Sequence, residues 1–147
     1  YSNFEAGTRI PLIISWPAVI TSGISNALVS HIDLYASLAK LTGQELEAGA
    51  AIDSRDQLAT FLGKDKKGRD YVIESAGALS IYDGEWKYIV PNNRSAYNKL
   101  TNTELGNNKE DQLYNLKKDI GEKNNVASEY PDIVARLKAK LEVEISH

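Results

Sequence analysis

The sequence contains no cysteine and no methionine, only two histidines, and no apolar run long enough to span a bilayer. Without cysteine, the chain has no disulfide, no thiolate nucleophile and no thiolate metal ligand. His147 is the last residue and His31 stands alone near the start of an expected helix, so no paired-imidazole metal motif exists. The net charge of −3 offers no basic field, and we expect neither a nucleic-acid nor a membrane partner.

Motifs of common catalytic sites are absent as well. The sequence has no G-x-S-x-G nucleophile turn, no P-loop and no G-x-G-x-x-G phosphate loop. Carboxylates are plentiful, but those at Glu45, Glu47, Asp53 and Asp56 fall in weakly patterned polar sequence, where surface solvation is the expected role. The sequence therefore predicts no catalytic residue and no metal ligand within this chain.

The composition is that of an ordinary globular protein. The 147 residues are 42% hydrophobic and 25% charged, which suits one domain, or one small domain plus a fragment. The chain begins with Tyr1 and has no methionine, so we expect a processed or excised segment.

The first third of the chain has the pattern of a strand followed by a helix. Ile10 to Trp16 is an apolar run of strand length with apolar residues on both faces, which is typical of a buried strand in a parallel sheet. Residues 30–42 have helical periodicity, with a capping box at Ser30 and Asp33 and a C-terminal Gly43. We expect residues 1–52 to be the end of a larger α/β domain.

The remainder, residues 53–147, predicts a small antiparallel sheet and one helix. Four short strands are expected at residues 71–75, 78–82, 85–90 and 112–116, with Asp83-Gly84 as a hairpin turn of the type that needs positive φ at both positions. Residues 91–109 are expected to be a loop or an extended hairpin tip. Pro131 opens an amphipathic helix, which completes an α+β fold.

Strand alternation assigns side chains to faces in the third strand. Trp86, Tyr88 and Val90 share one face, and Lys87 and Ile89 share the other. A tryptophan on an alternating strand is more often a core residue than a ligand platform. We therefore expect Lys87 to be an ordinary outward-facing charge.

Glu5, Gly7 and Arg9 precede the expected buried strand, in a place where loops often carry sites. Arg9 could pair with Glu5 and lock the loop, or it could bind an anion through two nitrogens. The structural ion pair is the favoured reading. Gly7 is expected to serve a special backbone angle.

Four segments in the same order resemble motifs of one enzyme family. They are residues 4–11 (FEAGTRIP), 29–35 (VSHIDLY), 83–89 (DGEWKYI) and 112–116 (QLYNL) followed by Asp119, Glu122 and Asn125. The chain resembles the C-terminal segment of a sulfatase of the arylsulfatase type, in the alkaline-phosphatase-like superfamily. The resemblance implies that residues 1–52 end the sulfatase catalytic domain and that residues 53–147 form its C-terminal subdomain.

This resemblance implies hydrolysis of sulfate esters by a formylglycine, made from Cys or Ser in C/S-x-P-x-R, beside a calcium ion. Neither C/S-x-P-x-R nor a D-N-G calcium motif occurs here, so we expect no cofactor in this segment and no activity from it alone. By resemblance, Glu5, Gly7 and Arg9 would lie beside the sulfate pocket as supports. The implied partners are the rest of the catalytic domain and a sulfated small molecule or glycan, and the implied location is periplasmic or secreted.

Two other functions remain open at this stage. The chain could be a non-catalytic carbohydrate- or protein-binding module, or part of a related phosphate-ester hydrolase. If the strand at residues 10–16 has no neighbour, its apolar edge predicts a homodimer.

Overall fold

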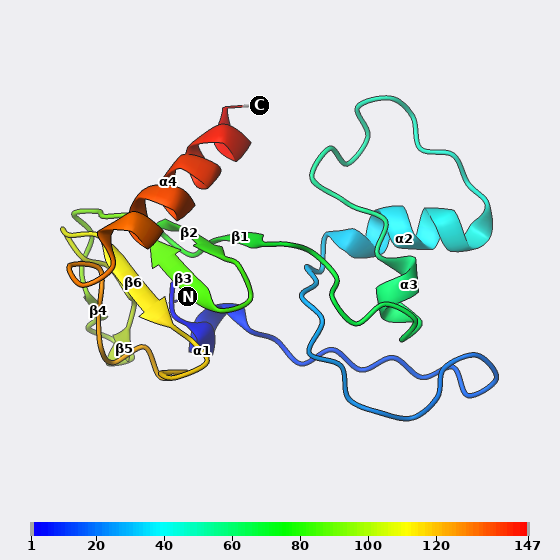
Figure 1. Ribbon diagram of the computed structural model, residues 1–147, viewed down its shortest axis with the longest axis horizontal. Coiled ribbons are helices and arrows are strands. Elements are labelled where there is room, and N and C mark those ends of the chain that lie inside the picture. The colour runs from blue at the N-terminus through cyan, green and yellow to red at the C-terminus, as the bar shows by residue number, and fades with distance from the viewer. Residues whose placement is uncertain (1, 147) are drawn as a thin grey trace. The chain divides into compact units, whose positions relative to one another are not determined.

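The computed structural model of the chain describes residues 2–146, so His147 lies outside the described residues. The described chain divides into two compact units (Figure 1). The sheet unit comprises residues 2–11 and 73–146, and the helical unit comprises residues 12–72. The domain division expected after residue 52 stays a prediction, because compactness within this chain does not test where a larger protein divides.

A four-stranded sheet is the centre of the sheet unit. Its strand order is β1 (Val72–Ser75), β2 (Leu79–Tyr82), β3 (Trp86–Ile89) and β6 (Gln112–Asn115). The β2–β3 and β3–β6 pairs are antiparallel. All four expected strands are therefore present. The expected loop at residues 91–109 carries a two-stranded hairpin tip, β4 (Tyr97–Asn98) and β5 (Thr103–Glu104).

The hairpin between β2 and β3 lies where the Asp83-Gly84 pair predicts it. Gly84 has a φ of +91°, but Asp83 is not among the residues with positive φ. The carboxylate of Asp83 instead accepts hydrogen bonds from the N–H groups of Glu85 and Trp86, at 3.0 and 2.7 Å. The turn is thus held by an aspartate side chain rather than by two residues of positive φ.

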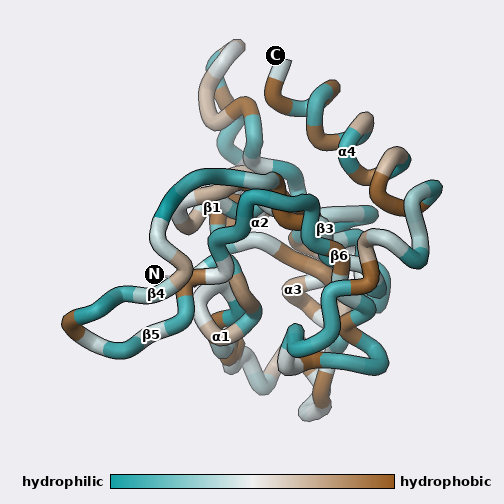
Figure 2. The backbone as a smooth tube through the Cα atoms, turned by 90° about the vertical axis from the view of Figure 1, so that its left-hand side faces the viewer, coloured by the Kyte–Doolittle hydropathy of each residue, from teal (hydrophilic) through white to brown (hydrophobic). Residues whose placement is uncertain are grey.

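Helix α4 (Pro131–Ile145) covers one face of the sheet and contacts β2 and β3 (Figure 1). Apolar and polar positions alternate along the helix in Figure 2. Its buried residues are Val134, Leu137 and Leu141, which lie three and four positions apart as a core-facing stripe requires. Pro131 occupies the first turn, where its missing N–H leaves no hydrogen bond unmade.

Strand register places two different sets of side chains on the two faces of the sheet. Ile81, Tyr88 and Leu113 are paired across the strands and are fully buried. On the opposite face the register aligns Ser80 with Ile89, Tyr82 with Lys87, Lys87 with Tyr114, and Ile89 with Gln112. Both sets include residues with no exposed surface, so both faces of the sheet are covered.

The N-terminal segment covers the second face. It contains a single helical turn, α1 (Glu5–Thr8), preceded by Phe4. Phe4 packs against a cluster formed by Ile89, Tyr114 and Leu116, with its ring edge-on to the ring of Tyr114 at 5.8 Å. The loop predicted around residue 7 is therefore a helical turn that lies on the sheet.

The helical unit is built on α2 (Asp33–Thr42) and the short α3 (Leu58–Phe61). Asp33 is fully buried and receives a bidentate ion pair from Arg69, whose Nε lies 2.7 Å from Oδ2. Asp33 also accepts the N–H of Ser30, which is one half of the expected capping box. Gly43 ends the helix with a φ of +69°, as its position predicts.

The expected strand at residues 10–16 is wrong: this segment has no regular secondary structure. Its apolar side chains are exposed, and Ile13 retains 89% of its accessible surface. A strand needs a hydrogen-bonded neighbour, and the described residues place none beside this segment. The homodimer predicted through this strand therefore has no strand edge to use, although dimerisation itself stays an untested prediction.

Apolar exposure extends through the helical unit. Further large apolar side chains that remain exposed there are Ile24, Tyr35, Leu38 and Leu41. The helix predicted at residues 30–42 is thus present as α2, but part of its apolar stripe has no cover within this chain. Among residues 2–146, no helix combines the length and apolar character needed to cross a bilayer.

Candidate functional site

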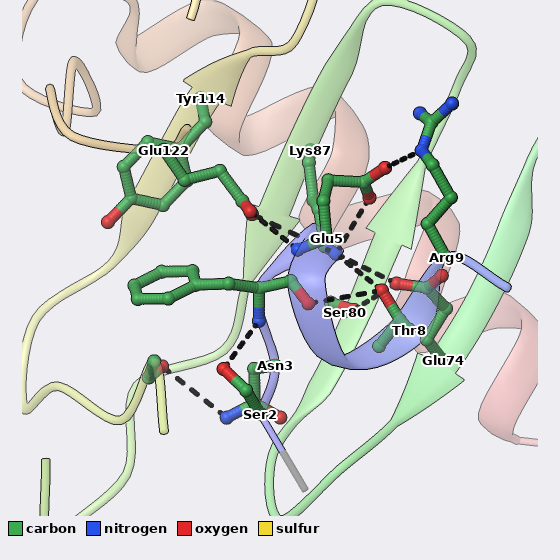
Figure 3. A network of polar contacts seen from close by, with 12 residues as sticks. Ser2, Asn3, Glu5, Thr8, Arg9, Glu74, Ser80, Lys87, Tyr114 and Glu122 are labelled. Atoms are coloured by element: carbon green, nitrogen blue, oxygen red, sulfur yellow. Dashed lines mark hydrogen bonds and ion pairs between the residues drawn. The ribbon is translucent and has the colours of Figure 1, made fainter. Parts of the chain in front are cut away.

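A largely buried group of charged and polar side chains lies between α1 and the sheet (Figure 3). We call it the Lys87 cluster, and it consists of Lys87, Glu5, Glu74, Glu122 and Thr8. These side chains come from four segments, namely α1, β1, β3 and the turn after β6. The cluster therefore joins parts of the sheet unit that are far apart in the sequence.

Lys87 is at the centre of the cluster, and its side chain has no exposed surface. Its ammonium lies 3.0 Å from a carboxylate oxygen of Glu5 and 3.0 Å from one of Glu74. It also donates to the hydroxyl of Thr8 at 3.1 Å. A buried ammonium is tolerated only when it is paired in this way.

The prediction that Lys87 faces solvent is wrong. Alternation along β3 does place it opposite Trp86 and Tyr88, as expected. The error lies in treating that face as open, because α1 and Phe4 cover it. Trp86 itself is half-buried and packs its ring against that of Tyr130 at 5.0 Å.

Glu122 completes the cluster from the turn after β6. One carboxylate oxygen, Oε2, accepts the backbone N–H of Glu5 at 2.6 Å. The other, Oε1, is buried without a hydrogen-bond partner and lies 3.8 Å from the Lys87 ammonium. Burial raises the pKa of Glu122 to about 7, although Lys87 and the N–H of Glu5 oppose the rise.

Glu5 and Arg9 form the ion pair favoured from the sequence. Arg9 Nε lies 2.5 Å from Glu5 Oε2, one helical turn away. The hydrogen bond to Glu5 is the main reason that the pKa of Arg9 is raised. Glu5 is buried whereas Arg9 is exposed, and the terminal nitrogens of Arg9 point away from the cluster (Figure 3). Tyr82 also lies near the Arg9 guanidinium and contributes to the raised pKa of Arg9.

Gly7 has a different role from the one predicted. Its φ is not positive, so no special backbone angle requires glycine here. Instead, a Cβ at this position would lie 2.4 Å from the backbone oxygen of Ser2. Gly7 therefore permits the close approach of α1 to the preceding segment.

Sequence reasoning missed four members of the cluster as parts of a site, namely Thr8, Glu74, Lys87 and Glu122. A signal existed for three of them, because Thr8, Lys87 and Glu122 fall within segments that resemble family motifs. The structure brings these segments together at one buried point. No comparable signal marks Glu74, which reaches the cluster through strand pairing alone.

The chain's residues do not fit the calcium site implied by the resemblance. Within residues 2–146, no three acidic or histidine side chains are grouped so as to hold a metal ion. In the Lys87 cluster an ammonium already lies among the carboxylates. His31 is exposed, as are the four carboxylates expected at the surface, Glu45, Glu47, Asp53 and Asp56.

A polar hollow of about 410 Å³ lies beside the cluster. Glu122 contributes to its wall, together with Phe4, Gln112 and Tyr114. The Tyr114 hydroxyl donates to Gln112 at 2.9 Å, and Gln112 donates to the carbonyl of Gly106 at 3.0 Å. The lining is therefore held in place by its own hydrogen bonds.

The chain is similar over nearly its whole length to known enzymes, although no family model matches it. It is 46% identical over 144 residues to N-acetylgalactosamine-6-O-sulfatase of Bacteroides thetaiotaomicron, covering 97% of this chain and 28% of that protein. It is 29% identical over 155 residues to human arylsulfatase A, covering 93% of this chain and 30% of that protein.

Solved structures agree with these relatives. One solved structure comes from work on glycosaminoglycan metabolism by Bacteroides thetaiotaomicron. The match covers all of this chain and 31% of the chain in that structure, with a TM-score of 0.96 and 45% sequence identity. A 2-O glycosaminoglycan sulfatase matches 78% of this chain and 24% of its own, with a TM-score of 0.52 and 25% identity. The chain thus spans about a third or less of the length of its relatives.

The close approach at Gly7 predicts a specific cost of adding one methyl group. We expect Gly7→Ala to destabilise the chain by about 1–3 kcal/mol, because the methyl would overlap the Ser2 backbone. Gly23→Ala is the matched control, since nothing lies within 4 Å of its added Cβ. Urea unfolding followed by circular dichroism measures both variants, and equal stabilities would contradict the close approach.

The buried ammonium predicts a large effect of neutralising Lys87. We expect Lys87→Met to lower the free energy of unfolding by about 3–5 kcal/mol, because buried carboxylates lose their cation. The control is Lys117→Met, which removes an exposed ion pair to Glu85 and should leave the urea midpoint unchanged. A Lys87→Met chain as stable as the control would show that the ammonium is dispensable.

Proposed function

Because the chain belongs to the sulfatase family and corresponds to a C-terminal segment of it, we propose that it is the C-terminal part of an enzyme that hydrolyses sulfate esters. One observation carries the proposal: the chain is 46% identical to a sulfatase over 97% of its length. The superposition of all of the chain on a related structure with a TM-score of 0.96 supports the same assignment.

The exposed apolar surface of the helical unit supports a role within a larger enzyme. Ile13 and Ile24 retain 89% and 97% of their accessible surface, and the apolar side of α2 is also open. Surfaces of this kind are ordinarily covered by another part of a protein. We infer that the rest of the sulfatase catalytic domain covers them, and that the nucleophile, the formylglycine and the calcium ligands belong to that domain.

For the substrate, we propose a sulfated sugar, specifically a 6-O-sulfate ester of an N-acetylgalactosamine unit. The support is the 46% identity to a protein named for this reaction. From the resemblance we also infer that the enzyme is exported to the periplasm or secreted, so that it can reach sulfated glycans outside the cytoplasm.

Within the enzyme, Glu5, Gly7 and Arg9 are proposed as supports of the sulfate pocket. Glu5 is held by Lys87 and in turn orients Arg9 through a 2.5 Å contact. Gly7 lets α1 lie against Ser2. A guanidinium held by Glu5 at Nε, with Tyr82 also beside it, keeps further N–H donors that a sulfate oxygen could accept, which gives these residues a positioning role without a bond-breaking one.

The proposal predicts activity in the intact enzyme and none in this chain alone. The intact enzyme should release sulfate from 6-O-sulfo-N-acetylgalactosamine and from a chromogenic aryl sulfate, as measured by ion chromatography and absorbance. The isolated chain should match a buffer blank, because it holds no C/S-x-P-x-R nucleophile segment. An aryl phosphate is the matched control substrate.

Three results would overturn this proposal. Sulfate release by the chain alone would show that it carries its own nucleophile. Release of phosphate but not sulfate by the intact enzyme would instead favour the phosphate-ester hydrolase. Saturable glycan binding by the chain, with no sulfate release by the intact enzyme, would favour a binding module.

Arg9 provides a test of the pocket support. We expect Arg9→Gln in the intact enzyme to lower kcat/KM for the sulfate ester by about 10- to 100-fold, since a charge-assisted hydrogen bond contributes about 1.5–3 kcal/mol. The control is Arg136→Gln, which removes an exposed ion pair with Asp83. Equal kcat/KM in the two variants would exclude Arg9 from the pocket.

A further inference from the structure

We propose that Glu122 is a positioning residue whose protonated carboxyl keeps α1, with Arg9, in place on the sheet. The inference deepens the proposed function and rests on it where it concerns catalysis. The part that concerns the proton rests on the geometry of the chain alone. Nothing in the resemblance to sulfatases assigns this role to Glu122.

The Lys87 ammonium has too few N–H donors to form a hydrogen bond with Oε1 of Glu122 as well. An ammonium has three N–H donors. Three oxygens lie at 3.0 to 3.1 Å from it, on Glu5, Glu74 and Thr8. The fourth oxygen, Oε1 of Glu122, lies at 3.8 Å and has no hydrogen-bond partner. A buried carboxylate oxygen without a donor favours the protonated form.

Charge arithmetic leads to the same conclusion. The cluster and Arg9 together bring three carboxylates and two cations into contact, and one proton makes the group neutral. The charged groups that face Glu122 are Glu5 on α1, Glu74 on β1 and Lys87 on β3. From β6, Tyr114 also lies near Glu122: burial, followed by the charge of Glu122, raises the pKa of Tyr114 to about 12.

Loss of the proton would act directly on α1. Glu122 Oε2 accepts the N–H of Glu5, the first residue of α1, and Glu5 carries Arg9. An ionised Glu122 adds a third negative charge beside the buried Glu5 and the half-buried Glu74, which weakens the packing of α1 on the sheet. The proton would pass to solvent, and Glu122 forms part of the wall of the neighbouring hollow.

The sign of the pH dependence follows from linkage. The folded chain binds this proton more tightly than the unfolded chain, so its contribution to stability is greatest at low pH. That contribution is lost as the pH rises from 4.5, the ordinary carboxyl value, to about 7. Over this window the folding equilibrium constant should fall by up to about tenfold per pH unit because of Glu122.

The first experiment uses the chain itself. The side-chain carbon of Glu122 is followed by ¹³C NMR as a function of pH, and its signal is identified by its absence in Glu122→Gln. We expect a midpoint near 7, with the amide signal of Glu5 moving at the same midpoint. A Glu122 midpoint below 5 would overturn the proposal.

Stability provides a second readout on the same chain. Glu122→Gln removes the titrating group but keeps an oxygen that can accept the N–H of Glu5. The urea midpoint of the wild type should fall between pH 5 and pH 8, whereas the urea midpoint of Glu122→Gln should not show this fall. Glu129→Gln, at an exposed carboxylate, is the control and should keep the wild-type fall. Parallel pH profiles for the wild type and Glu122→Gln would contradict the proposal.

The third readout is the pH profile of sulfate-ester hydrolysis by the intact enzyme. We expect wild-type kcat/KM to fall between pH 6 and 8 with a slope that Glu122→Gln abolishes, while Glu129→Gln behaves as wild type. A purely structural Glu122 would change the level of activity and leave the shape of the profile unchanged.

The readouts separate the two proposals. Identical pH profiles in an active enzyme would overturn the positioning role and leave the proposed function standing. Titration of Glu122 near 7, with no sulfate hydrolysis at any pH, would overturn the proposed function and leave the proton-holding carboxyl standing.

Discussion

The sheet unit depends on one constraint, which is that the ammonium of Lys87 has no exposed surface. A buried cation must be matched by carboxylates, and those carboxylates come from α1, β1 and the turn after β6. The N-terminal segment is therefore held on the sheet by charge as well as by the apolar contact of Phe4. Any movement of α1 would uncover a charged group that water cannot reach in the folded state.

This constraint relates the small sheet to the proposed chemistry. The Glu5 side chain uses one oxygen for Lys87 and the other for Arg9, so the position of an exposed guanidinium is set from inside the sheet unit. The helical unit has the opposite character, because much of its apolar surface is open. The sheet unit orients the Arg9 guanidinium, and the helical unit exposes apolar surface that a larger domain can cover. Both features are consistent with a segment of a larger enzyme.

Sequence reasoning identified the regular elements well. Alternation and turn residues located all four strands, Pro131 marked the start of α4, and Gly43 marked the end of α2. The Glu5–Arg9 pair was predicted because two opposite charges flank Gly7 in one short segment, and the structure confirms it. The strand at residues 10–16 was wrong, since an apolar run shows a tendency to be buried but supplies no neighbouring strand.

The amino-acid sequence by itself determined the local order of this protein: which segments are helices and strands, where they turn, and which family they resemble. Only the tertiary structure decided that Lys87 is buried, that Glu74 and Glu122 lie beside it, and that Gly7 serves a close contact instead of an unusual φ. The physical reason is that periodicity assigns a side chain to a face of an element, whereas its burial, partners and proton depend on what covers that face.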